Sequence, residues 1–315
     1  MISRLRSAIS TTASLKPISV SMLYDIRLHL SYDYDAAAGG SRHQVRVLPP
    51  TIAGLQRVVV ASLSFVPNPS ERTDFSDFFG NNVTSIAFRD VHDGLDIKMT
   101  ARVSVSRPEP GLDVSPDLQR LKEELGSVRS LSPSAPHHFL AASDHVGIDA
   151  AITAYAQESL AGSTVATAVD LCNRIHRDFT YDGKATTVQT RAGDAFALKR
   201  GVCQDFSHIM IAGLRGLGIP AGYVSGFLRT IPPKGKPRLE GADAMHAWVK
   251  VWCGRDAGWQ EFDPTNGMRA SNDHITVGYG RDYSDVAPIV GVLKTTGGQV
   301  GEQAVDVIPV AMEKV

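Results

Sequence analysis

Two segments of this chain alternate apolar and polar side chains with a period of two, and this pattern constrains its fold more than any other feature. In residues 24–34 every even position is apolar or aromatic and every odd position is polar. Residues 95–105 repeat the pattern, with the apolar side chains at the odd positions. Since successive side chains of a strand point to opposite faces, both segments are predicted to be half-buried strands.

Further strand candidates lie between these two segments, in residues 43–48, 56–66 and 83–90, separated by Gly, Pro and Asn. Residues 22–107 are therefore expected to form an antiparallel β-sandwich domain. Residues 1–21 contain basic residues, Ser and Thr, but no acidic residue and no continuous apolar stretch of the kind found in a secretory signal. We expect them to form a disordered extension.

The pattern becomes helical in the second half of the chain. Residues 108–138 are rich in Pro and Ser and are expected to be a linker and packing arm. Beyond them, apolar spacings of three and four are followed by strand patterns after Pro220. Residues 139–315 are therefore expected to form an α+β domain of helices followed by an antiparallel sheet. Helices are predicted over residues 118–125, 150–160, 164–179, 193–199 and 203–217, and strands over residues 221–228, 246–252, 259–263, 285–293 and 303–310.

The charge balance and the apolar content exclude several functional classes. The 315 residues include 32 Lys or Arg and 33 Asp or Glu, so no basic excess suggests a nucleic-acid partner. The longest apolar run, residues 58–66, is too short to cross a bilayer. Three cysteines without metal-ligand spacing favour a reduced, cytoplasmic protein over a disulfide-linked one, and they predict no metal site.

Cys203 is the residue most suggestive of chemistry, because residues 200–206 (Arg-Gly-Val-Cys-Gln-Asp-Phe) place it at the start of a predicted helix. Unpaired N–H groups and the positive end of the helix dipole stabilise a thiolate there, and the same N–H groups could hold a developing oxyanion. Asp205, in the first turn, is expected to cap the helix or to interact with its dipole rather than to act as a catalyst. The alternative for Cys203 is a small buried core residue, which is the preferred interpretation of Cys172 and Cys253.

A histidine and an aspartate further along the chain can be placed relative to each other by counting strand positions. The turn expected at residues 253–258 sets Trp252 opposite Trp259. In this register His246 and Asp263 are diagonal neighbours on one face of the sheet, about 7–8 Å apart between backbones, so that imidazole and carboxylate can meet. A one-residue bulge would put them on opposite faces. Taken alone, His246 could be a core histidine and Asp263 a turn residue before proline.

Four ordered motifs closely resemble those of the bacterial transglutaminase-like family. They are residues 201–206 (Gly-Val-Cys-Gln-Asp-Phe), 218–226 (Gly-Ile-Pro-Ala-Gly-Tyr-Val-Ser-Gly), 246–249 (His-Ala-Trp-Val) and 258–266 (Gly-Trp-Gln-Glu-Phe-Asp-Pro-Thr-Asn). Residues 280–288 are similar to the usual tail of the family, and residues 22–105 resemble the β domain that often precedes its core. The resemblance therefore covers nearly everything after residue 21.

The resemblance implies a papain-like core in which Cys203 is the nucleophile, His246 is the base and Asp263 orients His246. Two positions depart from the family pattern: Gly222 stands where Arg is common, and Lys250 stands where Glu is common. Neither departure removes the three site residues, but both leave the lining of the substrate cleft open.

These residues predict a cysteine-dependent enzyme that takes acyl groups from amide or peptide bonds of a protein or peptide substrate through a thioester. Because prokaryotic relatives are often described as cysteine proteases, hydrolysis by a protease or amidase is the preferred reaction. A protein-glutamine γ-glutamyltransferase with a primary amine acceptor is the alternative. A second alternative is a non-catalytic binding or assembly module. No cofactor, nucleic acid or membrane is implied, and no motif indicates an oxyanion donor beyond the Cys203 N–H.

Overall fold

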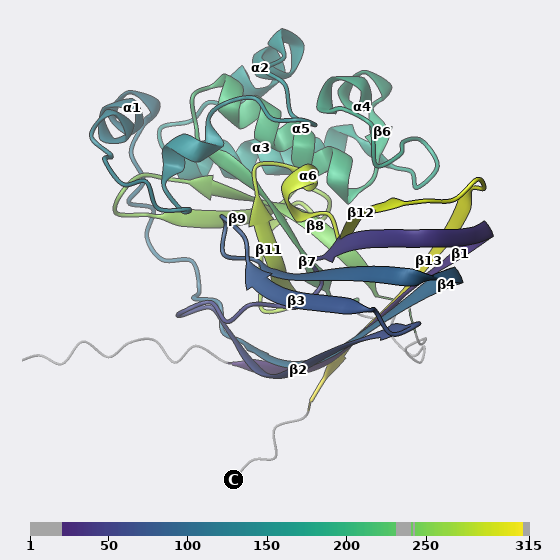
Figure 1. Ribbon diagram of the computed structural model, residues 1–315. Helices are drawn as coiled ribbons and strands as arrows, with labels where there is room; N and C mark the ends of the chain where they lie inside the picture. The colour runs from purple at the N-terminus through teal and green to yellow at the C-terminus, as the bar shows by residue number, and fades with distance from the viewer. Residues whose placement is uncertain (1–20, 231–240, 242, 311–315) are drawn as a thin grey trace, which may run out of the picture.

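The computed structural model describes residues 21–230, 241 and 243–310, which form three layers (Figure 1). Helices cover one face of a central five-stranded sheet, and a six-stranded sheet lies against its other face. The predicted disordered extension, residues 1–21, lies outside the described residues except for Ser21. None of the helices in the described ranges is long and apolar enough to cross a membrane.

The six-stranded sheet is built on two strands of 24 residues each, β1 (Met22–Val45) and β4 (Asn82–Val105). The second half of β4 pairs with β2 (Gln56–Val66), and its first half pairs with β3 (Glu71–Ser76). The apolar face predicted from the alternation is buried, with Tyr24 fully enclosed. The predicted antiparallel N-terminal region is confirmed, as one continuous sheet whose two halves share one hydrophobic core.

Four of the predicted strands merge into these two long ones. β1 contains residues 24–34 and part of residues 43–48, and β4 contains residues 83–90 and 95–105. The glycines between the predicted segments lie within irregular strand pairing, such as the register shift between Gly39 and Ser41, instead of forming turns that end a strand. Glycine inside a strand often marks such a bulge, which bends the strand without ending it.

The last two strands of the chain belong to the N-terminal sheet. β12 (Ile289–Leu293) and β13 (Gln299–Pro309) both pair with β1, and Val305 and Val307 are fully buried in the N-terminal core. The prediction that these strands continue the sheet of the second half of the chain was wrong. Alternation shows that a strand is half-buried, but it does not show which strand it pairs with.

The central sheet has the strand order β10-β9-β8-β7-β11 and provides two of the three predicted site residues. Its strands are β7 (Ala221–Leu228), β8 (Ala244–Trp252), β9 (Trp259–Asp263), β10 (Met268–Arg269) and β11 (His274–Gly280). The strands β7 and β9 have the predicted bounds. β11 was not predicted, although apolar and polar residues alternate between His274 and Tyr279; it is buried on both faces and carries a bulge between Thr276 and Gly278.

The helices pack on the central sheet around α5 (Cys203–Gly216), which is buried along nearly its whole length. It contacts three neighbouring helices and the strands β7 and β8, so its N-terminus is held firmly against the sheet. The other helical elements are α1 (Leu118–Gly126), η1 (Pro136–Phe139), α2 (Ala150–Gln157), α3 (Thr164–Asp178), α4 (Ala192–Leu198) and α6 (Tyr283–Val286), and a two-stranded ladder joins β5 (Thr180–Tyr181) to β6 (Arg200–Gly201). The predicted helix bounds agree within one turn.

Candidate active site

Cys203 is the first residue of α5 and differs from the other two cysteines in its exposure. Its side chain is half-buried, whereas Cys172 and Cys253 are buried in the core. Burial raises the pKa of both Cys172 and Cys253 to about 12, so neither thiol ionises near neutral pH. Among the three cysteines, Cys203 is therefore the one that combines access to solvent with the N-terminus of a helix.

Asp205 fixes the backbone just before Cys203. The backbone N–H of Val202 donates to Asp205 Oδ2 at 2.8 Å, and the Thr186 hydroxyl donates to the same oxygen at 2.6 Å. Burial raises the pKa of Asp205, and these two hydrogen bonds oppose that rise. The prediction that Asp205 caps the helix is confirmed, and the carboxylate is fully engaged in holding the segment that presents Cys203.

Gly201 is required by this arrangement, and its replacement provides a test of it. A Cβ atom at Gly201 would lie 2.5 Å from Asp205 Oδ2 and 2.8 Å from Asp205 Cγ. We expect Gly201→Ala to displace the Asp205 carboxylate from the Val202 N–H and to lower the free energy of unfolding by about 1–3 kcal/mol. Alkylation of Cys203 should slow in parallel, because the helix start moves.

The matched control is Gly183→Ala in the loop after β5, where a Cβ meets nothing within 4 Å. Denaturant unfolding and the rate of Cys203 alkylation check both variants. Equal stability and equal alkylation rates for the two variants would show that Asp205 does not depend on the glycine.

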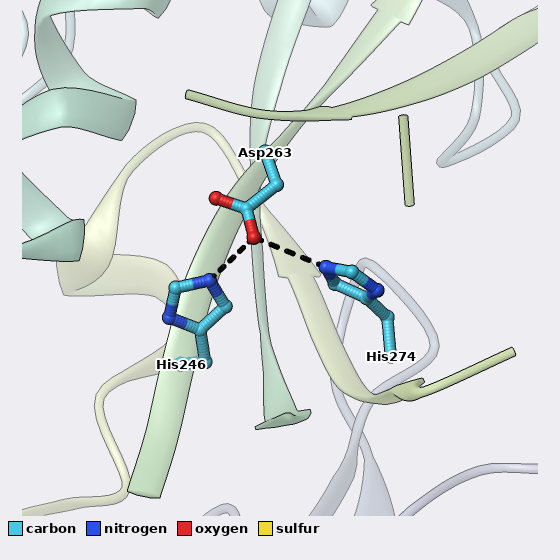
Figure 2. Close-up of side chains that lie close together, drawn as sticks. All are labelled: His246, Asp263 and His274. Atoms are coloured by element: carbon cyan, nitrogen blue, oxygen red, sulfur yellow. Dashed lines mark hydrogen bonds and ion pairs between the residues drawn. The ribbon is translucent and has the colours of Figure 1, made fainter. Parts of the chain in front are cut away.

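His246 and Asp263 meet as the strand register predicts. β8 and β9 pair with Trp252 opposite Trp259, and His246 Nε2 lies 2.8 Å from Asp263 Oδ2 (Figure 2). Because Asp263 engages Nε2, Nδ1 is the nitrogen left for Cys203. Burial by itself would lower the pKa of His246, but hydrogen bonds with Asp263 and Cys203 raise it to about 10. The imidazole is therefore positively charged at neutral pH, which favours a thiolate at Cys203.

Asp263 is fully buried, and within the described part of the chain five N–H groups point at its carboxylate. Backbone N–H groups of Thr265 and Asn266 donate to Oδ1 at 2.9 and 3.2 Å. The Asn266 side chain donates to Oδ2 at 2.6 Å, beside the two imidazoles of His246 and His274. Burial would raise the pKa of Asp263, but hydrogen bonds from His246 and His274 hold it well below its usual range. The carboxylate is thus ionised and fixed in orientation.

His274, at the start of β11, belongs to the site and was not predicted from the sequence. Its Nε2 lies 3.1 Å from Asp263 Oδ2, and its side chain is almost fully buried (Figure 2). The signal that could have found it is a histidine at the start of a short alternating segment, eleven residues after Asp263 and outside any of the motifs. Since β11 was not predicted, its position beside β7 could not be inferred.

The side chains of His246, Asp263 and His274 also meet the distance requirement of a metal site, with ligand atoms within 4.8 Å of one another. The hydrogen bonds around His274, however, argue against a metal site. The Ser271 N–H donates to His274 Nδ1 at 3.0 Å, so Nδ1 carries no proton. A metal-bound histidine normally donates a proton from its second nitrogen, and here that nitrogen is occupied by a donor. The arrangement fits hydrogen bonding better than metal coordination.

The Trp248 ring packs beside both His246 and His274. Its ring stacks on His246 with centroids 6.1 Å apart and meets the His274 ring edge-on at 5.2 Å. The indole Nε1 donates to Glu261 Oε2 at 2.7 Å, and Arg107 forms an ion pair with the same oxygen at 2.8 Å. Trp248 is therefore held in place by a buried charged pair, and this restricts how far either imidazole can rotate.

The two departures from the family pattern lie directly opposite each other on neighbouring strands of the central sheet. Gly222 on β7 pairs with Lys250 on β8. A Cβ at Gly222 would lie 2.7 Å from the Phe139 ring, and Lys250 Nζ lies 4.0–4.7 Å from the ring centroids of Phe139, Tyr279 and Trp259. Burial lowers the pKa of Lys250 to about 7. The departures therefore form one buried packing arrangement, with Lys250 only 6% exposed.

Comparisons with known proteins agree with this architecture. Residues 151–264 match the family model of the transglutaminase-like superfamily, and residues 24–104 match the bacterial transglutaminase-like N-terminal region. The first match encloses Cys203, His246 and Asp263.

Similar whole chains occur in mycobacteria. An uncharacterized protein of Mycobacterium tuberculosis is 36% identical over 300 residues, covering 93% of this chain and 95% of the relative. An uncharacterized protein of Mycobacterium leprae is 30% identical over 274 residues, covering 84% and 91% of the two chains. A Cytophaga hutchinsonii structure described as a "Putative Cysteine Protease" has a TM-score of 0.73 at 21% identity and covers 94% of this chain and 93% of that chain. At this identity, the similarity to the Cytophaga structure shows a shared fold.

Proposed function

This chain belongs to the bacterial transglutaminase-like family, and we propose that it is a cysteine-dependent acyl-transfer enzyme. In this proposal Cys203 is the nucleophile, His246 is the general base and Asp263 orients His246. The observation that carries it is the 2.8 Å contact between His246 Nε2 and Asp263 Oδ2, which leaves Nδ1 for the half-buried thiol at the start of α5. Nucleophile, base and orienting group are the three parts that covalent acyl transfer needs.

The first half of the reaction forms a thioester. The Cys203 thiolate attacks the carbonyl carbon of an amide, and the carbonyl electrons move to the oxygen, which accepts the backbone N–H of Cys203 at the helix start. When the carbonyl re-forms, the C–N bond breaks and His246 gives its Nδ1 proton to the departing amine. Asp263 keeps His246 in the orientation that aims Nδ1 at the reacting atoms.

The second half releases the acyl group to water. Neutral His246 takes a proton from a water molecule, the resulting hydroxide adds to the thioester, and the C–S bond breaks to restore thiolate and imidazolium. Partial exposure of Cys203 gives water access to the thioester. The description of the Cytophaga neighbour as a cysteine protease also supports hydrolysis. We therefore propose a peptidase or amidase acting on protein or peptide substrates, in the cytoplasm, where three free thiols are stable.

The choice between hydrolysis and amine transfer is tested by incubating the protein with a peptide library, with and without a fluorescent primary amine. Hydrolysis predicts new peptide ends that require Cys203 and no incorporated amine. Incorporation of the amine into glutamine-containing peptides would replace the hydrolase by a transglutaminase. Absence of both products would favour a binding or assembly module. Cys172→Ala, which alters a buried thiol, is the matched control for Cys203→Ala.

The ion pair proposed for Cys203 and His246 predicts unusual thiol reactivity. An ordinary thiol is only about 0.3% ionised at pH 6, whereas a thiolate paired with an imidazolium is largely ionised there. We expect iodoacetamide to label Cys203 selectively at pH 6 and His246→Ala to slow this labelling by at least about tenfold. Peptide mapping by mass spectrometry measures the rate at each cysteine. Slow labelling of Cys203 that does not depend on His246 would contradict the proposed pair.

A further inference from the structure

Two imidazoles donate to one carboxylate oxygen in this site, and the mechanism above uses only one of them. His246 Nε2 lies 2.8 Å and His274 Nε2 lies 3.1 Å from Asp263 Oδ2 (Figure 2). His246 comes from β8, Asp263 from β9 and His274 from β11, so three separate strands are needed to bring them together. His274 is almost fully buried, and its ring centroid is 6.2 Å from that of His246.

The backbone at Ser271 makes the two histidines different. The Ser271 N–H donates to His274 Nδ1 at 3.0 Å, so Nδ1 is an acceptor and the ring N–H that points at Asp263 is on Nε2. A backbone donor therefore occupies the second ring nitrogen of His274. His246 has no such restriction at Nδ1, because that nitrogen meets Cys203. The two rings therefore differ at Nδ1, which is occupied by a backbone donor in His274 and is left for Cys203 in His246.

The His274 N–H has an electrostatic effect on His246. The positive end of this dipole is directed at Asp263 Oδ2, the same oxygen that lies 2.8 Å from His246 Nε2. It draws electron density from the oxygen that accepts the His246 proton, and it opposes a positive charge on the His246 ring. Both effects weaken the hold of Asp263 on the imidazolium. Without His274, the buried carboxylate would therefore hold the His246 proton more tightly.

We propose that His274 is a positioning residue that limits the basicity of Asp263 and thereby sets the proton affinity of His246. The inference rests on the proposed function for its meaning, since His246 is the proposed base, but the proton affinity can be measured without a substrate. Other titratable groups face the same site. Cys203 from α5 interacts with His246, and Cys172 from α3 lies near Asp263 but is kept neutral, because burial raises its pKa to about 12.

Two substitutions separate the two hydrogen bonds of His274. The side-chain oxygen of His274→Asn can replace Nδ1 as the acceptor for Ser271, but this side chain is too short to donate to Asp263. The amide nitrogen of His274→Gln reaches the position of Nε2 and can donate to Asp263. Both variants remain polar, so each is a control for the other in folding and burial.

The test is an NMR titration of the full-length protein labelled at the histidine ring carbons, which follows the midpoint of His246. We expect His274→Asn to raise this midpoint by about 0.5–1 pH unit, a three- to tenfold gain in proton affinity. His274→Gln should stay close to the wild type. The remaining histidines in the same samples are the internal reference, and the amide spectrum reports the fold.

Each result of the titration either supports or contradicts the role proposed for His274. A midpoint that stays unchanged or falls in His274→Asn overturns the inference, and equal shifts in both variants show that His274 acts only through packing. The proposed function is judged separately, by the dependence of Cys203 labelling on His246. If that dependence is absent while His274→Asn raises the midpoint, the proposed function fails and this inference stands.

Discussion

Replacing Cys203 with alanine is expected to lower the rate of acyl transfer by roughly 10⁴- to 10⁶-fold, because the electron pair that forms the thioester is lost. The small remaining rate would come from substrate binding and the helix-start N–H groups. The fold should be retained, since Cys203 is only half-buried and packs at the edge of the core around α5. Product formation from the most reactive member of the peptide library measures the loss.

Cys172→Ala and Cys253→Ala are the controls for this experiment. Both thiols are buried, so their removal should cost about 1 kcal/mol of stability by leaving a small cavity, with activity within a few-fold of the wild type. Substantial activity in Cys203→Ala, or a loss as large in either control, would show that the nucleophile lies elsewhere.

Asp263→Asn is expected to reduce activity by roughly 10²- to 10⁴-fold and also to destabilise the fold. The three donors at Oδ2, from His246, His274 and Asn266, would meet an amide that cannot accept from all of them. His246 would then lose the orientation that aims Nδ1 at Cys203. We expect the free energy of unfolding at pH 7 to fall by about 2–5 kcal/mol, because buried donors are left without an acceptor. Denaturant unfolding and turnover measure the two effects.

The pH dependence of this loss has a definite sign. The folded-state pKa of Asp263 lies well below its unfolded value of about 3.9, so the carboxylate stabilises the fold above that pH and its contribution is lost as the pH falls through the folded-state value. The stability difference between the wild type and Asp263→Asn should therefore shrink below about pH 4. A difference that is constant between pH 7 and pH 3 would mean that the charge on Asp263 does not contribute to stability.

Asp205→Asn is the matched control for charge. Asp205 is an equally buried carboxylate near Cys203, but its hydrogen bonds come from Val202 and Thr186, and an asparagine oxygen can still accept the Val202 N–H. We expect this variant to retain activity within about tenfold of the wild type. An effect larger than that of Asp263→Asn would reverse the roles assigned to the two carboxylates.

The sequence predicted the geometry of the site where local rules determine it. The start of α5 follows from the residues around Cys203, and the contact between His246 and Asp263 follows from one tight turn, since pairing Trp252 with Trp259 determines every later pair. A structural role for Asp205 is predicted because a negative charge in the first turn suits the helix start, and the structure shows it accepting from the Val202 N–H three residues before it.

The remaining features depend on contacts between distant parts of the chain. His274 could not be placed, because β11 is buried on both faces and its position beside β7 depends on tertiary packing. Strands at the positions of β12 and β13 were predicted, but their partner β1 lies near the other end of the chain. Pairing between segments so far apart is decided by the buried side chains that they share, such as Val305 and Val307.

The central claim, a thioester on Cys203, is tested most directly by trapping the acyl-enzyme. The protein is mixed with an excess of a cleaved peptide, quenched in acid within the first turnover, digested and mapped by mass spectrometry. We predict an acyl adduct on the peptide that contains Cys203, which neutral hydroxylamine removes and which Cys203→Ala lacks. Product release without any adduct on Cys203, or an adduct on a different residue, would contradict the account.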